Sequence, residues 1–210
     1  MRRKATTSDL ETTKLHIIET AESLFRQVGY AKTTVTDIAK ALGMSQANIY
    51  RYFPSKASIN EAICNRLVHN IESQCWESLV KDGSSTERLK RLILEYHKTV
   101  KNNIIHEKCL YDMVAVAMNE HWEVIQGHSN RIRDLLRIII EQGISSGEFR
   151  KVDSVKMAEA VHNSLAVFVY PLLLEHEIND EDTINGKGHI DETLDQLIDL
   201  ILHGLSSVSK

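Results

Sequence analysis

The chain has 210 residues, of which 42% are hydrophobic and 26% are charged, a composition ordinary for a globular protein with a sizeable core. Two prolines and nine glycines favour long helices over a turn-rich β architecture. No run of 18 or more residues is apolar and uncharged, which excludes a membrane-spanning helix, and the three cysteines form no CxxC motif. We therefore expect a cytoplasmic protein.

The net charge of −4 is unevenly distributed along the chain. Residues 1–56 carry nine Lys or Arg and five Asp or Glu, whereas residues 57–210 carry 16 and 24. A basic N-terminal segment followed by an acidic remainder indicates that residues 1–56 bind a polyanion and that residues 57–210 do not. An excess of four positive charges is weak evidence on its own.

Two helices are predicted first. An apolar stripe over residues 9–28 predicts a helix that ends at Gly29, a residue suited to a left-handed C-cap. Thr34 and Asp37 then form an S/T-x-x-D/E capping pattern, which predicts the start of a second helix over residues 35–42.

A third helix follows a tight turn. Gly43 supplies the positive φ that such a turn needs, and Ser45 is a suitable N-cap. With Ile49 and Phe53 directed toward the core, the other side of this helix is polar and aromatic. Two short helices joined by a glycine turn, the second with a polar face, have the form of a helix-turn-helix.

The outward side of the third helix carries groups that can read a DNA major groove. The amides of Gln46 and Asn48 can pair with adenine edges, and Arg51 can reach guanine or a phosphate. Ala47 permits close approach, and Tyr50 can touch a thymine methyl group or a phosphate. Three neighbouring side chains are expected to hold the DNA backbone and set the register: Thr33, Thr34 and Lys56.

A polar face by itself is compatible with any amphipathic helix. The combination of a cap, a glycine turn, a polar second helix and local positive charge favours DNA binding. The rival interpretation is a ligand-binding or protein-interaction module whose helix-turn-helix is vestigial.

Residues 33–56, TTVTDIAKALGMSQANIYRYFPSK, resemble the tetracycline-repressor (TetR) family of bacterial transcription regulators, and the resemblance extends over about residues 11–71. The shared features are the Ile-Ala pair, the turn glycine, the Tyr-x-Tyr-Phe sequence and the closing lysine. The resemblance implies a homodimer whose two recognition helices read a palindromic operator, and a helical C-terminal part that binds a small-molecule effector and dimerises.

The resemblance also assigns roles to individual residues. By motif position, the family's DNA-contacting roles fall on Thr34, Ser45, Gln46, Tyr50, Tyr52 and Lys56. Val35 and Asn48 lie where members of the family vary, so operator preferences do not transfer to this chain.

The rest of the chain is predicted to be helical as well. Apolar stripes recur over Leu89–Val100, Ile105–Met118, Ile132–Ile144, Val155–Leu174 and Ile190–Leu205. With the N-terminal helices these give an all-α protein of about nine helices. We expect a helix-turn-helix DNA-binding domain over residues 1–72 and a helical effector-binding and dimerisation domain over residues 73–210.

The stripes near 153–174 and 190–205 are the most apolar and are the expected dimer helices. The resemblance implies that this helix pair from each subunit forms a four-helix bundle. The alternative is that both helices fill the core of the monomer.

An effector cavity is expected among the middle helices, lined by large apolar groups with a few polar ones. The candidate lining residues are Tyr96, Tyr111, Met113, Met118, Trp122, His162 and Phe168. For each of them plain core or surface packing is the favoured interpretation, and nothing indicates a particular ligand.

Metal, redox and catalytic chemistry find little support. No two of the ten histidines lie three or four residues apart, so no helical metal pair and no cofactor is predicted. Cys64 and Cys75 lie too far apart on one helix to pair, which leaves buried structural thiols and a redox switch as alternatives. The chain has no nucleophile elbow, phosphate loop or paired-carboxylate signature, so we do not expect an enzyme.

Overall fold

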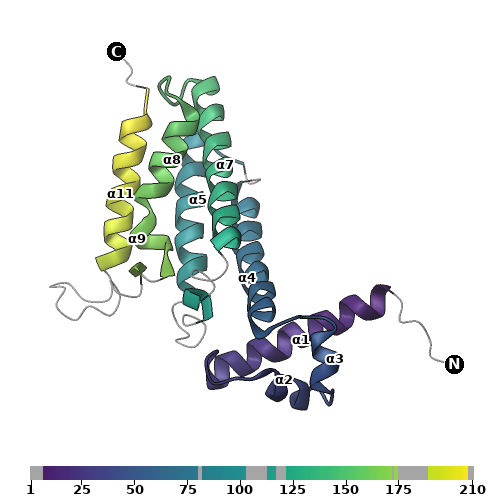
Figure 1. Ribbon diagram of the computed structural model, residues 1–210. Coiled ribbons are helices and arrows are strands. Elements are labelled where there is room, and N and C mark those ends of the chain that lie inside the picture. Colours follow the sequence, from purple (N-terminus) through teal and green to yellow (C-terminus); the bar gives the residue numbers. More distant parts are fainter. Residues whose placement is uncertain are drawn as a thin grey trace. The chain divides into compact units, whose positions relative to one another are not determined.

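The computed structural model describes residues 7–79, 82–102, 113–116, 122–171, 173–174 and 189–207, and this part of the chain is almost entirely helical (Figure 1). The helices are α1 (Thr7–Val28), α2 (Val35–Ala41), α3 (Gln46–Tyr50), α4 (Lys56–Leu79), α5 (Ser85–Val100), α7 (Trp122–Ser146), α8 (Ser154–Ser164), α9 (Ala166–Val169) and α11 (His189–Leu205). The all-α expectation is confirmed. None of these helices is both long and apolar enough to cross a bilayer.

The chain divides into two compact units. The first contains the described residues as far as Leu67 together with 113–116 and 122–124, and so holds α1, α2, α3 and the first half of α4. The second contains the rest of α4, together with α5, α8, α9, α11 and most of α7.

In the first unit α2 contacts both α1 and α3, and the three helices enclose a core with the start of α4. From α1 this core receives Ile17, Ala21 and Phe25, which are fully buried and recur every four residues. The apolar stripe predicted on α1 was partly wrong, because Leu15 and Val28 are 44% and 49% exposed. The line through Ile17 faces the core instead.

The second unit is a bundle in which α5, α7, α8 and α11 run alongside one another (Figure 1). Helix α5 contacts both α9 and α11. The ring of His97 joins these helices, with Nδ1 2.8 Å from the Phe168 carbonyl oxygen and Nε2 3.0 Å from Asp191 Oδ1. The apolar stripes predicted for α5 and α11 are confirmed. Helix α7 begins at Trp122, ten residues or nearly three turns before the apolar stripe predicted from Ile132.

The stripe Val155–Leu174 does not form one helix. Helix α8 ends at Ser164, α9 follows as a single turn, and Tyr170 is extended with φ −87° and ψ 117°. Tyr170 precedes Pro171, and the proline ring clashes with a helical conformation of the residue before it. The chain therefore bends here. Most of the predicted stripe Ile105–Met118 lies outside the described residues.

Candidate nucleic-acid interface

The turn between α2 and α3 is held by a helix cap on each side. Thr34 Oγ1 accepts a hydrogen bond from the Asp37 N–H at 3.2 Å, and Asp37 Oδ2 accepts one from the Thr34 N–H at 2.9 Å. The Thr34 hydroxyl also donates to Asp37 Oδ2, at 2.6 Å, and this hydrogen bond together with the one from the Thr34 N–H holds the pKa of Asp37 below its usual value. Gly43 has φ +63°, and Ser45 Oγ accepts from the Asn48 N–H at 3.2 Å. The predicted capping box, glycine turn and N-cap are all confirmed.

Helix α3 is short and clearly amphipathic. Ile49 is fully buried, whereas Gln46, Ala47 and Tyr50 are exposed. The helix ends at Tyr50, with the exposed Arg51 as its C-cap. This exposed surface of α3, which we call the α3 face, also includes the half-buried Asn48 at its edge.

Hydrogen bonds between side chains order the α3 face. Thr36 Oγ1 donates to Gln46 Oε1 at 3.4 Å, and Gln46 Nε2 donates to the Tyr50 hydroxyl oxygen at 3.2 Å. Arg51 Nη1 lies 3.5 Å from Asn48 Oδ1. Gln46 therefore retains one N–H, and Tyr50 its O–H, for an acceptor brought by a partner. The face presents mainly donors.

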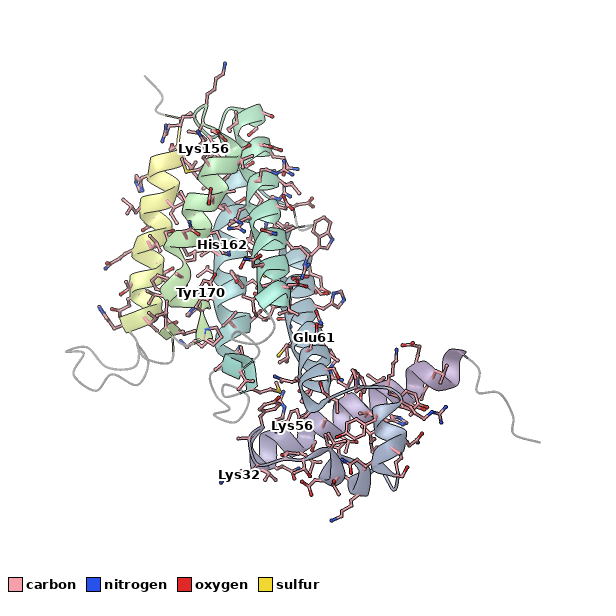
Figure 2. All side chains as sticks on the ribbon, viewed as in Figure 1. Lys32, Lys56, Glu61, Lys156, His162 and Tyr170 are labelled. Atoms are coloured by element: carbon pink, nitrogen blue, oxygen red, sulfur yellow. The ribbon has the colours of Figure 1, made fainter. Side chains whose placement is uncertain are left out.

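Lys56 is held by contacts within the first unit. Its ammonium donates to the carbonyl oxygens of Tyr30 at 2.8 Å and Thr33 at 3.1 Å, and it lies 4.1 Å from the centroid of the Tyr30 ring (Figure 2). These contacts tie the start of α4 to the turn after α1. Lys56 therefore has a structural role in holding this turn, and its predicted contact with DNA stays a prediction.

Thr33 and Tyr52 also differ from expectation. Thr33 is 2% exposed and its hydroxyl donates to the Gly29 carbonyl oxygen at 2.9 Å, so it stabilises the turn and does not offer a hydroxyl at the surface. Tyr52 is half-buried and packs against the core of the first unit. Sequence reasoning missed Thr36, which positions Gln46; its place next to the inward-facing Val35 would have indicated an outward side chain.

The predicted effector residues are not all in one place. Tyr96, His162 and Phe168 are buried in the second unit, whereas Met113 is fully buried in the core of the first. Tyr111 and Met118 lie outside the described residues, as does the side chain of Trp122.

A chain of hydrogen bonds runs through the second unit at Tyr96. Its hydroxyl lies 3.0 Å from His128 Nε2, and His128 Nδ1 lies 3.0 Å from Glu72 Oε1. Because a carboxylate only accepts, His128 donates from Nδ1 and, in its neutral tautomer, accepts the Tyr96 hydrogen. Arg131 Nε lies 2.7 Å from the other oxygen of Glu72. Burial raises the pKa of Tyr96 far above its ordinary value, so its hydroxyl stays protonated.

His162 on α8 is the contrasting buried histidine (Figure 2). It is 2% exposed, and neither ring nitrogen has a hydrogen-bond partner within the described residues. Burial lowers the pKa of His162, which keeps the ring neutral near pH 7. A neutral imidazole offers one donor and one acceptor, so His162 is a candidate for recognising a polar group.

The two described cysteines are structural. Cys64 and Cys75 are buried, and burial raises the pKa of each thiol to about 12. Thiols of this kind are poor nucleophiles at neutral pH, which favours packing over a redox switch. The described residues contain no group of three or more His, Cys, Asp or Glu side chains placed to bind a metal ion.

Comparison with known families agrees with this architecture. Residues 17–63 match the family described as bacterial regulatory proteins, tetR family, and residues 85–185 match the tetracyclin repressor-like C-terminal domain. The two matches cover the helix-turn-helix and most of the second unit.

Individual relatives extend the similarity over most of the chain. The HTH-type transcriptional regulator TtgR of Pseudomonas putida is 25% identical over 210 residues, which cover 94% of this chain and 95% of the relative. The HTH-type transcriptional repressor KstR2 of Rhodococcus jostii is 24% identical over 153 residues, 72% of this chain and 75% of the relative. A crystal structure of a TetR/AcrR-family regulator from Thermobifida fusca shares the fold, with a TM-score of 0.68, 24% identity and coverage of 92% and 98%.

A capped helix-turn-helix followed along the chain by a helical bundle is the architecture of bacterial transcription regulators that carry their DNA-binding and regulatory domains on one polypeptide. Within that class, the chain belongs to the TetR family of transcriptional regulators. Proteins of this family are regulators and not enzymes.

Proposed function

We propose that the protein is a homodimeric repressor that binds a palindromic operator and is released from it by a small-molecule effector. The observation that carries the proposal is the α3 face, where Gln46, Tyr50 and Arg51 are exposed side by side on a capped helix with a buried opposite side. A short helix of this kind fits the major groove, and its donors suit the acceptor edges of purines.

The side chains proposed to contact DNA fall into two sets, those that contact base edges and those that contact phosphates. Gln46, Asn48, Tyr50 and Arg51 are the proposed readers of base edges, with Ala47 allowing close approach. Thr34 and Ser45 lie at the N-termini of α2 and α3, where the local backbone favours a phosphate. Phosphate contacts would supply affinity, while contacts to base edges would supply discrimination.

Dimerisation would place two such faces about one turn of DNA apart, roughly 34–36 Å. The proposed interface is formed by residues 153–174 and 190–205. Large apolar side chains are exposed there on the single chain, with Val155 61%, Leu173 46% and Leu200 70% exposed. A second subunit would remove these side chains from water.

Effector control would follow from linkage. A ligand that binds better to a dimer with the wrong spacing of its reading helices must weaken DNA binding by the same factor. We assign DNA binding to residues 1–72 and effector binding and dimerisation to residues 73–210, in a cytoplasmic protein. The relative KstR2 is itself named a repressor, which supports repression over activation.

The proposal is tested by selecting duplexes from a random pool with purified protein at near-physiological salt, followed by sequencing. We expect a two-fold symmetric motif, bound by a particle with the mass of a dimer. Recovery of only weak, sequence-independent binding that disappears with added salt would favour the module with a vestigial helix-turn-helix.

A further inference from the structure

A groove with a volume of about 590 Å³ lies between α4 and α7 in the second unit. Its α4 wall includes Glu72, Trp76 and Glu77, and its α7 wall includes Arg131 and Asp134. On each helix the lining positions follow the i, i+3, i+4, i+7 spacing of one helical face, so that one face of α4 opposes one face of α7. Neither the proposed operator contacts nor the proposed dimer helices include this groove.

The apolar part of the groove is built around an unusually exposed aromatic side chain. Trp76 is 53% exposed, although tryptophan is a residue that proteins bury extensively on average. Leu135 and Ile138 line the opposite wall. A planar or bulky apolar molecule that covered Trp76 would gain contact with all three side chains.

The charges at the base of the groove cancel one another. Glu72 accepts from Arg131 Nε at 2.7 Å and from His128 Nδ1 at 3.0 Å, so both of its oxygens are occupied. Burial opposes ionisation of Glu72, but the hydrogen bonds from His128 and Arg131 and the charge of Arg131 outweigh burial and lower the pKa of Glu72. The Glu72 and Arg131 pair therefore adds little net charge for a ligand.

The remaining acids leave the groove negative. Glu77 on α4 and Asp134 on α7 are both exposed, and Glu77 has no ion pair within the part of the chain that the structure describes. Asp134 lies 3.5 Å from Arg137 Nε, while Arg137 is held more closely by Glu141, at 2.9 and 3.0 Å. Two carboxylates on opposite walls thus flank an exposed indole, and an aromatic face also attracts cations.

We propose that this groove binds organic cations with an apolar body, the cation lying between Glu77 and Asp134 and the apolar part against Trp76. As a binding site the groove stands on its own. As the site of the effector it rests on the proposed function, and it then identifies the effector as a hydrophobic cation. A ligand bound next to Glu72 would be coupled to the interior of the second unit through the hydrogen bonds from Glu72 to His128 and from His128 to Tyr96.

The test uses two ions of nearly the same size and shape and opposite charge, tetraphenylphosphonium and tetraphenylborate. The full chain carries the Trp122→Phe substitution, so that Trp76 is the sole tryptophan and its fluorescence reports binding directly. We expect saturable quenching by the phosphonium in the absence of DNA, and binding of the borate at least tenfold weaker.

Charge variants locate the site. The double variant Glu77→Gln, Asp134→Asn is expected to weaken phosphonium binding by about three- to tenfold, the scale of two exposed ion pairs. The matched control Glu11→Gln, Glu123→Gln removes the same charge from exposed positions on α1 and in the first turn of α7, outside the groove and the proposed dimer helices, and should leave binding unchanged. Equal binding of both ions, no quenching by the phosphonium, or equal effects of the two double variants would overturn the proposal. Failure of the proposed function would show in a different experiment, the selection of duplexes from a random pool, as the absence of an operator motif.

Discussion

In the first unit the side chains proposed to read DNA lie on the surface of α3, whereas in the second unit several polar side chains lie inside the bundle. Gln46 and Tyr50 are exposed and can change without disturbing a core. Tyr96, His128 and His162 are buried, where each missing hydrogen bond costs stability. A surface that reads DNA can therefore vary freely, whereas a buried polar site is tied to the stability of its fold.

The largest expected effect is a loss of stability when the buried side of α3 is truncated. Ile49→Ala removes a fully buried side chain from the core of the first unit and should lower its free energy of unfolding by about 2–5 kcal/mol. Urea denaturation followed by circular dichroism measures this. A loss below that of an ordinary surface substitution would mean that Ile49 does not anchor α3.

The buried histidines should respond in opposite directions. His162→Leu removes two nitrogens that lack partners among the described residues and should raise the free energy of unfolding by about 1 kcal/mol, whereas His128→Leu breaks two hydrogen bonds and should lower it by about 1–3 kcal/mol. Thermal and urea denaturation of the two variants compare them directly. Destabilisation by both would show that His162 is satisfied in solution.

Tyr50→Ala should reveal function without affecting stability. The side chain is 45% exposed, so unfolding should change by less than about 0.5 kcal/mol. Operator affinity should fall by about tenfold, equivalent to about 1.4 kcal/mol, because a groove contact is lost. Fluorescence anisotropy with the selected operator measures the affinity. Unchanged affinity would remove Tyr50 from the interface.

Lys56 and Arg51 should differ in the salt dependence of DNA binding. Lys56→Met frees the turn that carries Tyr30 and Thr33, so affinity should fall a few-fold while the slope of log affinity against log salt stays the same. Arg51→Met removes an exposed charge and should reduce that slope by about one. If Lys56→Met reduced the slope as much, Lys56 would be a phosphate contact after all.

The smallest expected effect is that the buried cysteines do not react with a disulfide reagent in the native protein. With Cys109→Ser in place, the native protein should leave Cys64 and Cys75 unmodified by a disulfide reagent at pH 7, because both are buried thiols with a pKa of about 12. Both should react after denaturation in urea. Rapid modification of the native protein would revive the redox alternative.

The sequence predicted the helix-turn-helix well because its signals are local. Thr34 and Asp37 satisfy each other within one turn, and Gly43 and Ser45 act at their own positions. The role of Lys56 could not be read in this way, because its ammonium binds carbonyl groups 23 and 26 residues earlier in the chain.

The second unit was predictable in outline only. Apolar periodicity located α5 and α11, but it continued one stripe from α8 to Leu174 despite the signal of Pro171 after Tyr170, and the break between α8 and α9 at Leu165 had no such signal. Which buried polar groups have partners depends on packing between helices far apart in sequence. The contrast between His128 and His162 therefore needed the structure.

The claim that the α3 face reads DNA is tested most directly by comparing selected operators for the wild-type chain and the Gln46→Ala variant. The wild type should recover a two-fold symmetric motif, and the variant should lose preference at one base pair in each half-site while the other positions are kept. Two identical motifs, or no motif for the wild type, would contradict the account.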